Sequence, residues 1–204
     1  IRLGKVLQTL GLRVPIKVEK NGQFDIEDFK SKLSDKTKLV AISAVVNVTG
    51  VIQPIKEIIE ITRNKNKNAL VLVDAAQSML HFRHDVQDLD ADFLVFSGHK
   101  LFTPMGIGVM YGKKELLEKM PPFLYGGDMI EFVTEQKSTF AQLPNKFEGG
   151  TQNVEGAVTL EEAINFIEEI SYEKINEIEN SLTKNALEKL KKLKPAGNTG
   201  QQSL

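Results

Sequence analysis

Cysteine is absent from the sequence, which has 204 residues. Its absence excludes a disulfide framework, a metal site with cysteine ligands and a cysteine nucleophile within these residues. The sequence also lacks an apolar run long enough to span a membrane, and no basic segment precedes an apolar stretch of the kind that directs export. We therefore expect a cytoplasmic protein with no membrane partner.

A strong charge of either sign is missing as well. Lysine and arginine together number 26, aspartate and glutamate number 27, and the net charge is −1 at pH 7. So balanced a chain creates no field that would favour nucleic acid as its main partner. The locally basic clusters at 65–67 and 189–194 are interpreted as solvated helix ends.

Segments typical of strands and helices alternate along the chain. This alternation predicts an α/β fold with a mostly parallel sheet and flanking helices. Strands are expected at 39–46, 69–74, 93–97 and 106–112, after an extended segment at 13–18. Helices are expected at 25–33, with Asp25 as its cap, and at 54–63, 75–80, 113–120, 154–167 and 171–193. The stretch 121–150, with several prolines and glycines, is expected to be a long irregular loop.

Polar residues follow three of the predicted strands at the point where each strand ends. In doubly wound sheets, ligands bind beyond the carboxyl ends of the strands, so these residues are expected to converge on one site. The first strand is followed by Asn47, Thr49 and Gly50, the second by Asp74 and Gln77, and the third by Ser97, His99 and Lys100.

A lysine and an acid at neighbouring strand ends match the needs of pyridoxal phosphate. The lysine amine condenses with the aldehyde of this cofactor, and an acid facing the ring nitrogen keeps that nitrogen protonated. Asp74 and Lys100 lie 26 residues apart in the sequence (100 − 74), at the ends of successive predicted strands. Ser97 and His99 offer a hydroxyl and an imidazole to the phosphate.

Other interpretations of these motifs are less specific. Ser97 and Gln77 can each be an ordinary loop residue that hydrogen-bonds locally. His81 and His84 have the spacing of a metal-binding pair, but no cysteine or helical carboxylate is near, so they are interpreted as surface residues and no metal site is expected. The glycines of GIGVMYG resemble a nucleotide loop, but they follow the lysine turn and open no helix.

The motifs together resemble those of a known family. VLVDAAQ, followed by FLVFSGHKLFTPMGIGVMYG and then FEGGTQN, is similar to the class V aminotransferases, which are pyridoxal phosphate enzymes of fold type I. Within that family the resemblance is to the cysteine desulfurase and selenocysteine lyase branch, which serves iron–sulfur cluster assembly. The resemblance covers about residues 5 to 190.

The resemblance implies roles for the residues around the cofactor ring. Lys100 would bind the cofactor covalently as its internal aldimine, and Asp74 would pair with the pyridine nitrogen. Gln77 would hydrogen-bond the ring hydroxyl. Asn47 would lie near that hydroxyl and the substrate carboxylate.

The resemblance also implies the phosphate contacts and the assembly. Ser97 and His99 would contact the phosphate. Thr151 in GGTQN looks like the threonine that reaches the phosphate of the partner subunit's cofactor, so a homodimer with shared sites is implied. A sulfur-acceptor protein and a small amino-acid substrate would be the other partners.

The sequence differs from the family pattern in lacking two of its parts. A phosphate loop and a ring-stacking histidine are expected upstream of the matched part, and a small domain with the nucleophilic cysteine and an arginine downstream. Because the chain begins at Ile1 and ends in the polar run KPAGNTGQQSL, we expect a fragment. Its expected parts are 1–170 of the cofactor-binding large domain, a helix at 171–193 leading toward the small domain, and a tail at 194–204.

Several activities stay open at this point. A cysteine desulfurase would convert L-cysteine to L-alanine and leave the sulfur as an enzyme persulfide. Selenocysteine lyase, isopenicillin epimerase-like and kynureninase-like enzymes of the family reuse the same lysine and aspartate. A non-catalytic protein that keeps the fold is the alternative from another class, and the missing cysteine is what favours it.

Overall fold

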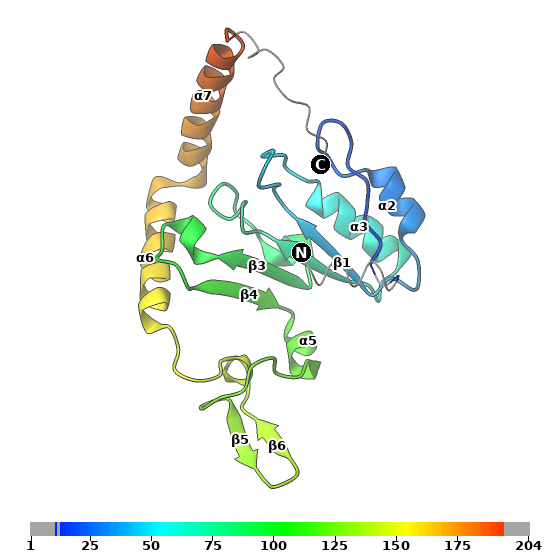
Figure 1. Cartoon of the computed structure of the whole chain (residues 1–204), viewed down its shortest axis with the longest axis vertical. Helices are drawn as coiled ribbons and strands as arrows, with labels where there is room; N and C mark the ends of the chain where they lie inside the picture. The colour runs from blue at the N-terminus through cyan, green and yellow to red at the C-terminus, as the bar shows by residue number, and fades with distance from the viewer. Residues whose placement is uncertain (1–10, 12, 194–204) are drawn as a thin grey trace, which may run out of the picture.

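The computed structural model describes residue 11 and residues 13–193 (Figure 1). Within these residues the main sheet has four strands in the order β1-β2-β3-β4, formed by Leu39–Ser43, Leu70–Asp74, Phe93–Ser97 and Gly108–Gly112. The first three strands run parallel, and β4 runs antiparallel to β3. The predicted α/β fold with a mostly parallel sheet is confirmed.

The helices that accompany the sheet differ widely in length. They are α2 (Ile26–Lys32), α3 (Ile55–Lys65), α4 (Val86–Leu89), α5 (Lys114–Lys119), α6 (Val154–Ile170) and α7 (Tyr172–Leu190), with 3-10 turns η1 (Gly98–Leu101) and η2 (Asn145–Phe147). The Asp25 carboxylate accepts from the amide of Asp28, which confirms the expected cap of α2. In Figure 1, α6 runs beside the sheet and α7 continues away from it. None of the described helices is long and apolar enough to cross a membrane.

One face of the sheet carries the hydrophobic core. Val40 and Ile42 of β1 are buried, as are Val71 and Val73 of β2, whereas the residues between them are more exposed. Successive side chains of a strand point to opposite faces, so the buried set shares one face. Helices α2 and α3 cover that face with Phe29, Ile58 and Ile59 among other residues.

An ion-pair network joins α3 to the sheet. The Asp92 carboxylate accepts from Arg63 Nη2 at 2.8 Å and from the Val71 amide at 2.7 Å, and Lys113 Nζ lies 3.1 Å from its other oxygen. Asp90 binds the same two cations. Hydrogen bonds from Lys113 and then Arg63 hold the pKa of Asp90 below its usual value. With its side chain 6% exposed, Asp92 depends on these partners for its solvation.

Several local predictions were wrong. The stretch 75–80 forms hydrogen-bonded turns instead of a helix, because the Ala75 carbonyl accepts from both Ser78 and Met79 and no continuous ladder follows. The expected loop after it contains α4, whose cap is Asp85. The strand expected at 39–46 ends at Ser43. The extended segment at 13–18 contributes a single bridge, between Val18 and Phe24.

The stretch 121–150 is also more regular than expected. It contains an antiparallel hairpin of β5 (Ile130–Val133) and β6 (Ser138–Phe140), which forms a small sheet of its own. The hairpin projects away from the main sheet, at the lower end of Figure 1. The expected tail at 194–204 lies outside the described residues, and the division into domains stays a prediction.

Candidate active site

Two of the predicted site residues end neighbouring parallel strands. Asp74 is the last residue of β2 and Ser97 is the last residue of β3, so both lie at the same edge of the sheet. Asp74 is paired in register with Val95, which lies two positions before Ser97. Because strand side chains alternate, Asp74, Val95 and Ser97 project from the same face. The sheet therefore presents a carboxylate and a hydroxyl on one face, with Ser97 two residues further along its strand than the position opposite Asp74.

Lys100 lies in the tight turn η1 that follows β3. Gly98 opens this turn, and its amide donates to the Ile107 carbonyl at 2.9 Å. A Cβ at Gly98 would stand 2.5 Å from Ile107 Cγ2 and 2.6 Å from Thr103 Oγ1, so only glycine fits there without rearrangement. The turn ends at Phe102, which has a left-handed φ of 69°. The half-buried lysine is thus held close to the end of β3.

Helix α6 packs against the lysine turn η1. Leu101 is 2% exposed, and α6 buries Leu160, Ala163 and Ile167. The rings of Phe102 and Phe166 meet edge to face with centroids 6.0 Å apart.

Asn153 connects α6 to the same loop, and sequence reasoning missed it. Its Oδ1 accepts from the Gly156 amide and caps α6, while its Nδ2 donates to the Gly106 carbonyl at 3.1 Å. An asparagine directly before a predicted helix is a typical cap, and that signal was available. The contact with Gly106, 47 residues away, had no signal in the sequence.

The structure brings four of the predicted residues together in two pairs. Gln77 Nε2 donates to Asn47 Oδ1, across the ends of β1 and β2. Ser97 Oγ lies 2.7 Å from His99 Nδ1, beyond the end of β3. In the same turn as Gln77, the Asp74 carboxylate accepts from the Ala76 amide at 2.9 Å.

Thr151 lies outside these two pairs. It is exposed, and its side chain makes no hydrogen bond with any part of the chain that the structure describes. A threonine that serves a partner subunit has no need of a contact within its own chain. Its role stays a prediction.

The two histidines interpreted as surface residues are both partly buried. His84 Nε2 lies 2.8 Å from the hydroxyl of Ser78, which is fully buried, and burial lowers the pKa of His84. His81 Nδ1 lies 2.8 Å from Glu179 Oε1 on α7. The surface interpretation is therefore wrong, since each ring has a specific partner.

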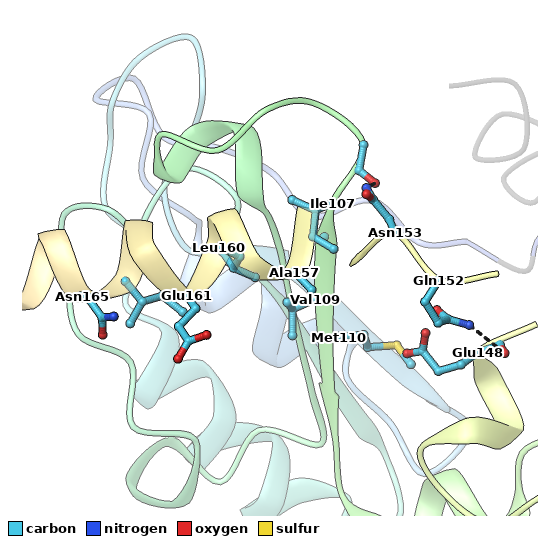
Figure 2. Close-up of a pocket in the computed structure, with 13 residues that line it drawn as sticks. Ile107, Val109, Met110, Glu148, Gln152, Asn153, Ala157, Leu160, Glu161 and Asn165 are labelled. Atoms are coloured by element: carbon cyan, nitrogen blue, oxygen red, sulfur yellow. Dashed lines mark hydrogen bonds between the residues drawn. The ribbon is translucent and has the colours of Figure 1, made fainter. Parts of the chain in front are cut away.

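A hollow of about 770 Å³ lies elsewhere, between β4 and α6 (Figure 2). Val109 and Met110 line it from β4, and Ala157 and Leu160 line it from α6. None of the predicted site residues lines this hollow. The candidate active site is thus the open edge formed by the strand ends, outside the hollow.

The donor set at that edge fits pyridoxal phosphate. Lys100 supplies an amine for the aldehyde, and Asp74 supplies a carboxylate for the ring nitrogen. The amide pair can meet the ring hydroxyl, and the hydroxyl–imidazole pair can meet the phosphate. Each chemical group of the cofactor therefore has a counterpart among side chains that follow β1, β2 and β3.

Comparison with known proteins decides the family. The model of the Aminotransferase class-V family matches residues 3–203. The chain belongs to the class V aminotransferase family. The family depends on pyridoxal phosphate, which agrees with the donor set at the strand ends.

Similar members of the class V family are cysteine desulfurases. A probable cysteine desulfurase of Halalkalibacterium halodurans is 49% identical over 176 residues, which are 86% of this chain and 43% of that protein. The crystal structure of the Escherichia coli cysteine desulfurase CsdA superposes with a TM-score of 0.86 at 35% identity, over 93% of this chain and 47% of that one. The apo cysteine desulfurase of Thermococcus onnurineus gives 0.84 at 37% identity, over 92% and 46%. The chain thus spans less than half the length of these relatives, and it contains no cysteine.

Proposed function

We propose that this chain forms the lysine-bearing half of the active site of a pyridoxal phosphate-dependent cysteine desulfurase. The reaction would convert L-cysteine to L-alanine and transfer the sulfur to a protein thiol, which becomes a persulfide. The observation that carries the proposal is the placement of Asp74 and the Lys100 turn at adjacent parallel strand ends. The similarity to cysteine desulfurases over 86% of the chain supports the choice of reaction.

Each residue of the site would make one contribution. Bound pyridoxal phosphate supplies an electron sink for bonds broken at the substrate Cα. Lys100 would hold the cofactor covalently, and Asp74 would hold a proton on the ring nitrogen. The pair of Asn47 and Gln77 would orient the ring through its hydroxyl.

Ser97 and His99 would hold the phosphate. Their side chains already meet at 2.7 Å, so the hydroxyl and the imidazole face one position beyond β3. A cofactor fixed at its phosphate and at its ring nitrogen cannot rotate away from Lys100. This is the positioning that the proposed chemistry requires.

The thiol that receives the sulfur must come from outside these residues, because the sequence has no cysteine. We propose that it lies in another part of the complete protein and passes its sulfur to an acceptor protein for iron–sulfur cluster assembly. The sulfur transfer would take place in the cytoplasm, as expected from the sequence.

A homodimer with shared sites is part of the proposal. The segment before β5 and β5 itself expose large apolar side chains: Phe123 is 88% exposed, Tyr125 67%, Phe132 68% and Val133 66%. Apolar groups gathered on one projecting segment are typical of a protein interface. A second copy placed there would also give the exposed Thr151 a cofactor to reach.

Covalent trapping tests the cofactor site. The protein is incubated with pyridoxal phosphate, reduced with borohydride, digested and mapped by mass spectrometry. We expect one dominant adduct, on Lys100, which Lys100→Ala removes and Lys119→Ala, a change at the exposed end of α5, leaves in place. No adduct on Lys100 at saturating cofactor would refute the site and favour the non-catalytic alternative.

Product analysis tests the reaction. The complete protein should release L-alanine from L-cysteine in step with the formation of a protein persulfide. Release of alanine from selenocysteine alone, or turnover of another amino acid alone, would assign the chain to a different activity of the same family.

A further inference from the structure

Helix α7 is fastened to the turn at residues 75–82, which carries Gln77. Asn176 Nδ2 donates to the His81 carbonyl at 2.9 Å, and the Tyr172 hydroxyl donates to the Met79 carbonyl at 3.2 Å. Glu179 places its two carboxylate oxygens 2.8 and 2.9 Å from His81 Nδ1. Three residues spread over about two turns of α7 therefore contact one short segment.

The segment 75–82 is held together by its own hydrogen bonds. The Ala75 carbonyl accepts from the amides of Ser78 and Met79, and the Ser78 carbonyl accepts from those of His81 and Phe82. The Ser78 side chain is fully buried and lies against His84. A displacement of His81 is therefore passed along the segment to Gln77 instead of being absorbed by a flexible loop.

The two ends of the segment face different partners. At one end Asp74 closes β2 and Gln77 reaches Asn47, whereas at the other end His81 is bound by α7. No continuous helix runs through this segment, so its orientation depends on the buried Ser78 in its middle and on the contacts at its two ends. The α7 end is where the structure supplies contacts that are independent of the candidate site.

We propose that Asn176 and Glu179 are positioning residues for the candidate active site. They hold the 75–82 turn so that Gln77 stays beside Asn47, where the two amides would meet the hydroxyl of the cofactor ring. The inference rests on the proposed function for its reference to the cofactor. The mechanical part, the fastening of the turn by α7, rests on the contacts alone.

Hydrogen–deuterium exchange of the cofactor-free protein tests the mechanical part. Asn176→Ala removes the bond to His81, and Asn180→Ala is its control, one helical turn later on an exposed position. A hydrogen bond contributes about 1 kcal/mol, so exchange in peptides covering 75–82 should be about fivefold faster in Asn176→Ala and unchanged in Asn180→Ala. Equal exchange in the two variants would overturn the proposal.

Cofactor binding tests the positioning part. Glu179→Ala loses both contacts with His81, whereas Glu177→Ala loses a charge on the same helix from an exposed ion pair with Lys174. We expect the dissociation constant of pyridoxal phosphate to rise about fivefold and the visible absorbance maximum to shift in Glu179→Ala alone. A lower melting temperature with unchanged affinity and spectrum would show a merely structural role and refute the proposal.

The two experiments keep this inference apart from the proposed function. Wild-type protein that fails to bind the cofactor at Lys100 would refute the proposed function. The exchange comparison would still decide whether α7 holds the turn.

Discussion

Gly98 is the position where a single added carbon should disturb the lysine turn. In Gly98→Ala the new Cβ would stand 2.5 Å from Ile107 Cγ2, 2.6 Å from Thr103 Oγ1 and 3.3 Å from the Ile107 carbonyl oxygen. Thr103 is 8% exposed and its hydroxyl donates to the Pro104 carbonyl, so it has little room to turn away. The loop that carries Ile107 would have to move instead.

The size of the effect follows from these distances. An ordinary contact begins at 3.4 Å, so Ile107 must retreat by 0.9 Å (3.4 − 2.5). Overpacking of this kind costs about 1–3 kcal/mol. A penalty of about 2 kcal/mol lowers the melting temperature of a domain of this size by about 4–8 °C. Because the Gly98 amide also donates to the Ile107 carbonyl, the strain falls on the turn that holds Lys100.

The assay compares Gly98→Ala with Gly127→Ala. A Cβ at Gly127 would meet nothing within 4 Å, so this control makes the same chemical change without a clash. We expect Gly98→Ala to melt lower by the amount above and to bind pyridoxal phosphate more weakly, and Gly127→Ala to match or slightly exceed the wild type. Equal melting temperatures for the two variants would show that the turn is not tightly packed and would refute this reasoning.

Three further predictions concern titratable residues. Asp92→Ala should lower the free energy of unfolding in urea by about 3 kcal/mol, because it leaves the buried Val71 amide without its acceptor and leaves Arg63 and Lys113 with Asp90 as their remaining anion. Removing the exposed Asp88 should change it little. Asp74→Asn should leave Lys100 open to borohydride trapping but slow turnover of the complete protein about 100-fold, as stopped assays of alanine would show. Burial lowers the pKa of His84 in the folded protein. As the pH falls below about 6.5, His84 is therefore protonated in the unfolded chain before it is protonated in the folded protein, and the free energy of unfolding should decrease over that pH range. His84→Gln should show a smaller difference between the urea midpoints at pH 8 and pH 5.

The elements that build the core were predictable from the sequence because buried segments are rich in apolar residues. The continuous apolar run before Asp74 and the three-to-four spacing of apolar residues in α3 indicate a buried strand and a helix, and the strand that ends at Asp74 was placed correctly. The same logic placed the end of β3 at Ser97. Polar residues directly after such strands therefore pointed to a site at the sheet edge.

Elements with little buried surface escaped prediction for the same reason. The hairpin of β5 and β6 is mostly exposed, and α4 is a single turn whose residues are not buried. The direction of β4 was also open, since periodicity identifies a strand but not the course of the chain that leads to it. Its antiparallel pairing follows from the short return through the η1 turn and the loop at 102–107.

The supports of the site were beyond the reach of sequence patterns because they join distant residues. Asn153 meets a carbonyl 47 residues away, Asn176 meets one 95 residues away, and Glu179 meets a ring 98 residues away. Two of these three contacts end on backbone carbonyls, which every residue carries, so the side-chain identity of the acceptor gives no clue. The groups that would touch the cofactor are set by strand ends, whereas the groups that hold them are set by how α6 and α7 pack. A substitution on α7 can therefore alter the site without changing any residue that the sequence marks as part of it.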